Sequence, residues 1–159
     1  MDLDSLKALD PSKDMVAGLL LDACSAHDPD GKAQEKMILH LLKMGADVNE
    51  TDKNGVTPLH RAVRFRSPSA VRLLIKKGAD VNCQDKKTWS TPLHRAVTST
   101  GAPATKGKAD EIEEIVQLLL SGGADPKIKN RMGKMPIEYA KDAEVQSLIK
   151  GIANKRSRD

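Results

Sequence analysis

The fold is decided by residues 52–82, DKNGVTPLHRAVRFRSPSAVRLLIKKGADVN. Asp52 and Gly55 stand at the first and fourth positions of a β-turn, where these residue types are favoured. Thr57 and Pro58 then predict the start of a short helix, because a proline in the first turn leaves no hydrogen bond unmade. The apolar residues that follow keep the i, i+3, i+4 spacing of one helical face: Leu59, Ala62 and Val63.

The second half of this stretch predicts another helix that runs back along the first. Ser67 and Pro68 form a cap and a first-turn proline. The buried side of this helix is expected to consist of Val71, Leu74 and Ile75. Lys76 and Lys77 suit the negative end of the helix dipole, and Gly78 predicts a left-handed helix end. Two such helices cannot bury both of their faces, so the unit must stack on neighbours.

Degenerate copies of this unit lie on both sides of it. The TPLH motif occurs at 57–60 and at 91–94, and MPIE holds the equivalent place at 135–138. Gly-Ala-Asp begins at Gly45 and again at Gly78, a step of 33 residues that indicates a stacked array. A further copy begins at Gly123.

This combination of TPLH, an apolar helix and GADVN resembles the ankyrin repeat. The resemblance implies an all-α solenoid of about four stacked helix-turn-helix units, with short β-hairpin-like turns between repeats. At 159 residues, a single domain is expected. Its parts are a lead-in (1–13), repeats 1 to 4 (14–49, 52–82, 85–126 and 130–152), an insertion within repeat 3 (100–110) and a basic tail (153–159).

Helical apolar stripes are predicted in the other repeats as well. They comprise Leu19, Leu20, Ala23 and Cys24, then Met37, Ile38, Leu41 and Leu42, then Ile112, Ile115, Val116, Leu119 and Leu120, and finally Val145, Leu148, Ile149 and Ile152. Two departures from the pattern stand out. The turn of repeat 3, residues 85–90, has lost its glycine and gained one residue, and residues 100–110 add a segment of small residues.

Composition narrows the class of protein. The formal net charge is +4, and aromatic residues make up only 2% of the chain. No apolar run approaches the length of a membrane span, and the acidic start, MDLD, does not predict a secretory signal. Cys24 and Cys83 lie in different repeats and are expected to be free thiols. We therefore expect a monomer in the cytoplasm, with the nucleus as the alternative in a eukaryotic source.

The histidines of the TPLH motifs, His60 and His94, are the first candidates for chemistry. A metal site would need its ligands to converge within about 2 Å of one ion, whereas equivalent positions of stacked repeats lie a layer apart. The resemblance implies a structural role instead. In that role, each histidine bonds the preceding threonine and the backbone of the next repeat.

Two further motifs fail on their spacing. Residues 101–109 have five residues between the glycines, where a phosphate loop has four, and Ala109 stands where Ser or Thr is needed. Residues 28–31 start like a calcium loop but lack its later acidic ligands. No catalytic residue, cofactor site or metal site is predicted, so the chain is not expected to be an enzyme.

The resemblance implies that partners bind across the turn tips and the exposed side of the inner helices. On this chain those positions are Lys53, Asn54, Val56, Arg64, Phe65, Lys86, Lys87, Trp89, Arg131, Met132 and Lys134. Each tip supplies a cation, which predicts an acidic partner surface. The alternative is a solvated charged rim, with Trp89 folded over its own turn and Phe65 packed beneath the turn at Ser67 and Pro68.

The functional hypothesis is a non-enzymatic protein–protein interaction module, an adaptor or scaffold. One alternative is a regulatory subunit or inhibitor that occludes a partner enzyme. Another is nucleic-acid contact through the basic tail around Lys155 and Arg158, although no base-stacking platform accompanies it. Neither a small-molecule substrate nor a membrane is expected as a partner.

Overall fold

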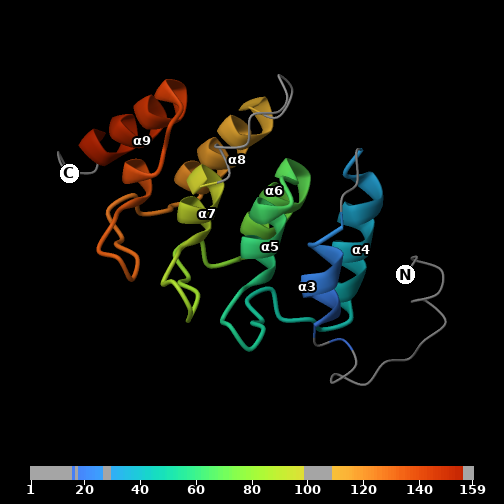
Figure 1. Cartoon of the computed structure of the whole chain (residues 1–159). Coiled ribbons are helices and arrows are strands. Elements are labelled where there is room, and N and C mark those ends of the chain that lie inside the picture. Colours follow the sequence, from blue (N-terminus) through green and yellow to red (C-terminus); the bar gives the residue numbers. More distant parts are fainter. Residues whose placement is uncertain (1–15, 17, 27–29, 99–108, 156–159) are drawn as a thin grey trace.

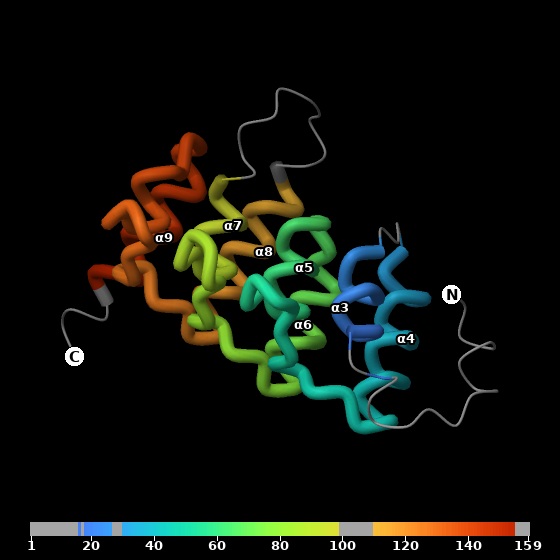
Figure 2. Tube along the Cα trace, turned by 60° about the horizontal axis from the view of Figure 1, so that its bottom comes forward, coloured from blue at the N-terminus to red at the C-terminus, as the bar shows by residue number. Residues whose placement is uncertain are grey.

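The computed structural model describes residues 16, 18–26, 30–98 and 109–155. Its helices form two layers that advance along the chain from one end of the molecule to the other (Figures 1 and 2). The inner layer contains α3 (Leu19–Ala23), α5 (Pro58–Arg64), α7 (Pro92–Thr98) and the 3-10 turn η2 (Pro136–Glu138). The outer layer contains α4 (Lys32–Lys43), α6 (Pro68–Lys76), α8 (Ala109–Ser121) and α9 (Ala143–Lys155).

Contacts between successive helices of each layer, and between the layers, make this a helical solenoid. α3, α5, α7 and η2 touch in that order, as do α4, α6, α8 and α9. The described residues contain no strand. The predicted all-α stack of helix-turn-helix units is therefore confirmed.

One continuous core runs between the layers. The stripe of α5 is fully enclosed, with Leu59, Ala62 and Val63 at most 1% exposed. Buried residues from the predicted stripes of the other repeats continue it: Leu20, Cys24, Ile38, Leu41, Val71, Leu74, Ile112, Ile115, Val116, Leu119, Leu120, Val145 and Ile149. The remaining stripe residues are half-buried at its edge: Leu19, Ala23, Met37, Leu42, Ile75, Leu148 and Ile152.

The helix ends of repeat 2 follow from its sequence. The side chain of Ser67 accepts a hydrogen bond from the backbone N–H of Ala70 at 3.3 Å. Gly78 ends α6 with φ at +91°, and the next N–H, of Ala79, donates to the carbonyl of Leu74 at 3.0 Å. The predicted cap and the predicted left-handed stop are both present.

Asn49 ties repeat 1 to repeat 2, and Asn82 ties repeat 2 to repeat 3. The amide of Asn82 donates to the carbonyl of Gly123 and accepts from the N–H of Asp125, at 3.3 and 2.7 Å. Asn49 makes the same pair of bonds to Gly78 and Asp80. These bonds fix the register between adjacent GAD turns.

Repeat 4 departs from the predicted pattern because its inner helix shrinks to the single turn η2. Ten residues separate the helix caps Thr57 and Ser67 of repeat 2, whereas seven separate Met135 and Asp142. The chain therefore lacks about one helical turn before Asp142, whose side chain accepts from the N–H of Glu144 at 2.8 Å and starts α9.

Some predicted segments fall outside the described residues. These are the lead-in (1–13), most of the insertion (100–110) and the last four residues of the basic tail. The helix α8 already begins at Ala109, and α9 continues to Lys155, past the predicted end of repeat 4 at 152. In the part of the chain that the structure describes, every helix is too short or too polar to cross a bilayer.

The two cysteines are free, as expected. Cys24 is buried at the end of α3, and Cys83 is half-buried. Burial, helped by the negative charge of Glu50, raises the pKa of the Cys24 thiol to about 12. A thiol that stays protonated is a poor nucleophile, so Cys24 belongs to the core rather than to a reactive site.

Candidate functional site

Three turn tips project from the same edge of the stack, below the helices in Figure 1. They are tip 2 (52–56), tip 3 (85–90) and tip 4 (130–134), which open repeats 2, 3 and 4 respectively. Each is closed by a backbone hydrogen bond, from Asp52 to Val56 at 3.1 Å in tip 2. Asp85 N–H bonds Ser90 at 3.1 Å in tip 3, and Asn130 N–H bonds Lys134 at 2.9 Å in tip 4. We call the three tips together the tip ridge.

Neighbouring tips are also bonded to each other. The N–H of Lys86 in tip 3 donates to the carbonyl of Asn54 in tip 2 at 2.8 Å. The N–H of Arg131 in tip 4 donates to the carbonyl of Thr88 in tip 3 at 2.9 Å. Gly55 makes the first approach possible, because a Cβ there would lie 2.9 Å from Cγ of Lys86. The ridge is therefore one braced surface rather than three separate loops.

The aspartates of the ridge are saturated by internal hydrogen bonds. Asp52 accepts from two backbone N–H groups of its own tip and from the guanidinium of Arg61 at 3.1 Å. Asp85 is 1% exposed and accepts from Thr88 and from Arg95 at 3.2 Å, among others. Burial raises the pKa of both carboxyls, but these donors outweigh it, so both pKa values are lowered.

In tip 4 a neutral pair replaces this ion pair. Asn130 stands where the aspartates stand, and its amide donates to the hydroxyl of Tyr139 at 2.9 Å. Tyr139 occupies the place of Arg61 and Arg95 on its inner turn. Arg61 and Arg95 thus neutralise the aspartates of tips 2 and 3, and tip 4 has a neutral asparagine in the same place.

The cations of the ridge, in contrast, face the solvent. The exposed residues are Lys53, Lys86, Lys87, Arg131 and Lys134. None of them takes part in an ion pair with a carboxylate of the described residues, where the pairs belong to Arg61, Arg72 and Arg95. The ridge therefore presents net positive charge.

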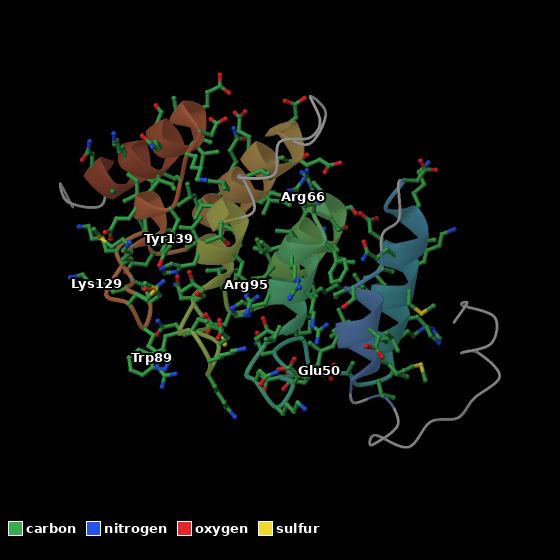
Figure 3. All side chains as sticks on the ribbon, viewed as in Figure 1. Glu50, Arg66, Trp89, Arg95, Lys129 and Tyr139 are labelled. Atoms are coloured by element: carbon green, nitrogen blue, oxygen red, sulfur yellow. The ribbon has the colours of Figure 1, made fainter. Side chains whose placement is uncertain are left out.

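Trp89 occupies an unexpected backbone position. It has φ at +54° and corresponds to Gly55 and Gly133, each at +72°. Tryptophan thus fills the left-handed position that glycine fills in the other two tips. Trp89 is 50% exposed and lies at the outer edge of the ridge (Figure 3). The guanidinium of Arg131, from the neighbouring tip, lies 5.4 Å from the centroid of the Trp89 ring.

The structure divides the sequence-predicted partner residues into two groups. The tip ridge brings together Lys53, Asn54, Val56, Lys86, Lys87, Trp89, Arg131, Met132 and Lys134, of which Val56 is half-buried and the others are exposed. Arg64 and Phe65 lie at the other end of α5, beside Arg66, which Figure 3 places far from the tips. Phe65 is 38% exposed.

The histidines have the structural role that the family resemblance implied. Nδ1 of His60 lies 2.8 Å from the Thr57 hydroxyl, and Nε2 lies 3.0 Å from the carbonyl of Ser90 in the next repeat. His94 repeats this arrangement with Thr91 and Lys134. Burial lowers the pKa of His60 to about 4, so the ring is neutral at pH 7. The described residues contain no cluster of three metal-ligating side chains.

Sequence reasoning missed the residue that replaces these motifs in repeat 1. Glu50 extends from the connection to repeat 2 and accepts from the N–H groups of Gly18 and Leu21, at 3.2 and 3.3 Å. It thereby caps α3, whose first residue follows a glycine rather than a threonine. The missing TPLH motif was the signal that some other acceptor had to perform this role.

Comparison with known proteins identifies the family. Residues 20–130 match the family model described as ankyrin repeats, in three copies. The chain belongs to the ankyrin repeat family. Ankyrin repeats indicate a protein–protein interaction module.

Several relatives and solved structures share this repeat array. The chain is 47% identical over 74 residues to the neurogenic locus Notch protein of Drosophila melanogaster, covering 46% of this chain and 3% of that protein. It is 31% identical over 106 residues to Rabankyrin-5 of Mus musculus, covering 67% and 9%. The B-cell lymphoma 3 protein homolog of Mus musculus is 32% identical over 122 residues, with coverage of 76% and 25%.

Among solved structures, the ankyrin repeat domain of Bcl-3, described as a unique member of the IkappaB protein family, superposes with a TM-score of 0.66 at 30% identity. The match covers 83% of this chain and 50% of that domain. The chain thus spans only a small part of the curated relatives that it matches, between 3% and 25% of the three named above.

Proposed function

We propose that this chain is a non-enzymatic adaptor that binds an acidic surface of a partner protein across the tip ridge. The observation that supports this most directly is the separation of charge on the ridge. Asp52 and Asp85 are bonded internally, while five cations face the solvent without a carboxylate partner among the described residues. A surface arranged in this way attracts carboxylates and repels other cations.

The bracing of the ridge supports the same proposal. Because the tips are already bonded to each other through Asn54 and Thr88, little backbone freedom is left to lose when a partner binds. The exposed lysine and arginine side chains also steer an oppositely charged partner during its approach. The association rate is therefore expected to fall as the salt concentration rises.

The test is affinity capture from a native lysate of the source organism, followed by mass spectrometry. A ridge variant carries Lys53→Ala, Lys87→Ala, Trp89→Gly and Arg131→Ala. A control variant with the same loss of three positive charges carries Lys36→Ala, Lys43→Ala and Lys76→Ala on the outer helices α4 and α6. Circular dichroism melting verifies that both variants are folded.

A protein captured by the wild type and by the control variant, but not by the ridge variant, would support the proposal. Equal capture by all three proteins would contradict it and direct attention to other surfaces, beginning with Arg64 and Phe65 at the far end of α5. Capture that fails in the ridge variant and in the control alike would indicate binding through net charge only.

The alternative of a regulatory subunit uses the same surface and differs in its effect on the partner. If the captured protein is an enzyme, its activity is measured with and without this chain. Inhibition would favour occlusion, and unchanged activity would favour an adaptor. The free thiols of Cys24 and Cys83 support a reducing compartment such as the cytoplasm for either function.

A further inference from the structure

We infer that the tip ridge takes an extended acidic segment carrying one bulky apolar side chain, which packs on Trp89, Arg131 and Met132. This inference rests on the proposed function and narrows it from an acidic surface to one class of peptide. Three features at the junction of tip 3 and tip 4 support it: the backbone conformation of Trp89, the ordered guanidinium of Arg131 and the exposed apolar side chain of Met132.

The backbone of Trp89 is held in a conformation that tryptophan disfavours. A left-handed φ costs a residue with a Cβ on the order of 1 kcal/mol, and glycine avoids this cost in tips 2 and 4. Trp89 nevertheless remains 50% exposed. The strained position therefore places a large aromatic surface at the solvent edge of the ridge.

Arg131 is fixed beside this ring from three directions. Its N–H bonds the carbonyl of Thr88, its guanidinium Nη1 donates to the carbonyl of Lys87 at 3.0 Å, and the guanidinium lies over the Trp89 ring. The other guanidinium N–H groups form no hydrogen bond to the described residues. An arginine held in this way is prepared to receive a carboxylate, because its side chain is already ordered.

Met132 adds the apolar component. Met132 is 73% exposed, and its sulfur lies 3.7 Å from the hydroxyl of Tyr139, which limits where the side chain can move. The large apolar side chains exposed in the described part of the chain are Leu39, Phe65, Trp89 and Met132. Trp89 and Met132 are on neighbouring tips of the ridge, so both can offer apolar surface to one bound segment.

The dimensions of the ridge suit an extended segment. Stacked helices lie about 8–10 Å apart, so three tips span roughly 20 Å. An extended peptide advances about 3.3 Å per residue, and about six residues cover that distance. With its apolar side chain at Trp89, carboxylates of the segment fall near Arg131 and Lys87 and, further along, near Lys86 and Lys53. Single-stranded nucleic acid fits less well, because the ridge presents one exposed aromatic ring rather than a row of them.

The test begins with selection from a display library of random dodecapeptides against the full chain. We expect the selected peptides to share at least two acidic residues and one bulky apolar residue. Because Trp89 is the only tryptophan of the chain, its fluorescence reports directly on contact by a synthetic selected peptide. We expect its emission to change in proportion to the bound fraction.

Trp89→Gly is the decisive variant, since glycine already serves the equivalent position in tips 2 and 4 and the fold should be retained. Binding measured with a labelled peptide should weaken about tenfold or more in this variant. Lys76→Ala, on the outer helix α6, serves as the control and should bind as the wild type does. A twelve-residue oligo-dT competes as a test of simple polyanion binding.

Each other outcome would overturn the inference in a distinguishable way. If acidic peptides bind the Trp89→Gly variant with the same affinity as the wild type, the inferred apolar contact with Trp89 is wrong. Basic or neutral peptides, or no enriched peptides at all, would remove the acidic segment, while the lysate capture would still decide the proposed function. If oligo-dT competes as strongly as the selected peptide does, the ridge binds polyanions in general rather than a specific protein segment.

Discussion

The ring nitrogen Nε2 of His60 donates a hydrogen bond of 3.0 Å to the carbonyl of Ser90, so each TPLH histidine completes its own repeat with an atom of the next one. The same ring accepts from Thr57 through Nδ1. This arrangement requires the neutral ring, because a protonated Nδ1 has no lone pair with which to accept.

Stability should therefore fall as the pH is lowered from about 6.5 towards about 4, the ordinary and the folded pKa values of His60. A lowered histidine pKa contributes stability that is complete above the unfolded value and is lost as the pH falls through the folded value. The loss for His60 is roughly 3 kcal/mol at about 1.4 kcal/mol per pKa unit. His94, whose pKa burial also lowers, adds to it in the same direction.

Urea unfolding at pH 7 and pH 4.5 measures this loss. His60→Gln should be less stable than wild type at pH 7 but should lose less on acidification, because one of the titrating rings is gone. An equal loss in both proteins would mean that His60 does not carry the pH dependence.

Glu50 should show that a carboxylate cap can be better without its charge. Burial raises the pKa of Glu50, and the charges of Asp47 and Asp22 add to that effect, while the N–H groups of Leu21 and Gly18 oppose it. A raised carboxyl pKa contributes stability that is complete below the unfolded value and is lost as the pH rises through the folded value. The folded protein therefore accommodates the charged carboxylate of Glu50 less well than the unfolded chain does.

Glu50→Gln keeps an oxygen acceptor for Gly18 and Leu21 and should be at least as stable as wild type at pH 7. Glu50→Ala removes the cap and should cost about 1 kcal/mol. Thermal melting of the two variants measures the contrast. A larger loss in Glu50→Gln than in Glu50→Ala would contradict the role of the side chain as a hydrogen-bond acceptor for the start of α3.

Gly78 and Gly151 form a matched pair in which space is not limiting. A Cβ at either position would meet nothing within 4 Å, but Gly78 has φ at +91° whereas Gly151 lies inside α9. Gly78→Val should destabilise by about 1–2 kcal/mol or more, since a branched side chain resists the left-handed region. Gly151→Ala should stabilise by up to about 1 kcal/mol through helix propensity.

Denaturant titration of both variants provides the measurement. Opposite signs would show that conformation alone distinguishes the two glycines. A Gly78→Val protein as stable as wild type would remove the assignment of Gly78 as the left-handed end of α6.

Arg66 allows the backbone cost of a left-handed residue to be measured. It follows α5 with φ at +54°, and its N–H bonds the carbonyl of Val63 at 3.1 Å, as a helix-ending glycine would. Arg66→Gly and Arg66→Ala both remove the arginine side chain, but only alanine keeps a Cβ, so Arg66→Gly should be more stable than Arg66→Ala by about 0.5–1 kcal/mol. The midpoint of urea unfolding tests this difference. Equal midpoints for the two variants would show that the left-handed backbone at this position carries no cost.

The fold was predictable because its determinants are local. A turn, a capped helix, a second helix and a left-handed glycine follow one another within residues 52–82, and repetition supplies the rest. The shortened inner turn of repeat 4 was not predicted, although the three residues missing before Asp142 were visible. The exposed tip residues followed from the family resemblance, and their role in binding stays a prediction.

The features that were missed depend on residues distant in the sequence. Glu50 caps a helix about 30 residues earlier, and Asn82 bonds a turn about 40 residues later, so neither can be inferred from its neighbours in the chain. Local spacing also gave no reason to expect that Trp89, rather than a glycine, takes the left-handed position of tip 3. The ion pairs of Asp52 with Arg61 and of Asp85 with Arg95 were missed as well, and these pairs leave the exposed cations to set the charge of the ridge.

The direction of the histidine bridges has a consequence for how the molecule is made. His60 bonds the carbonyl of Ser90, and His94 bonds the carbonyl of Lys134. The hydrogen bonds of each of these inner helices are therefore complete only after the next repeat has been synthesised. Glu138 stands in the place of a third histidine. Its carboxylate accepts from the N–H of Met135 at 2.6 Å, so this bond needs no residue of a later repeat. On the ribosome, repeat 4 is thus self-sufficient at this position, and its emergence completes repeat 3.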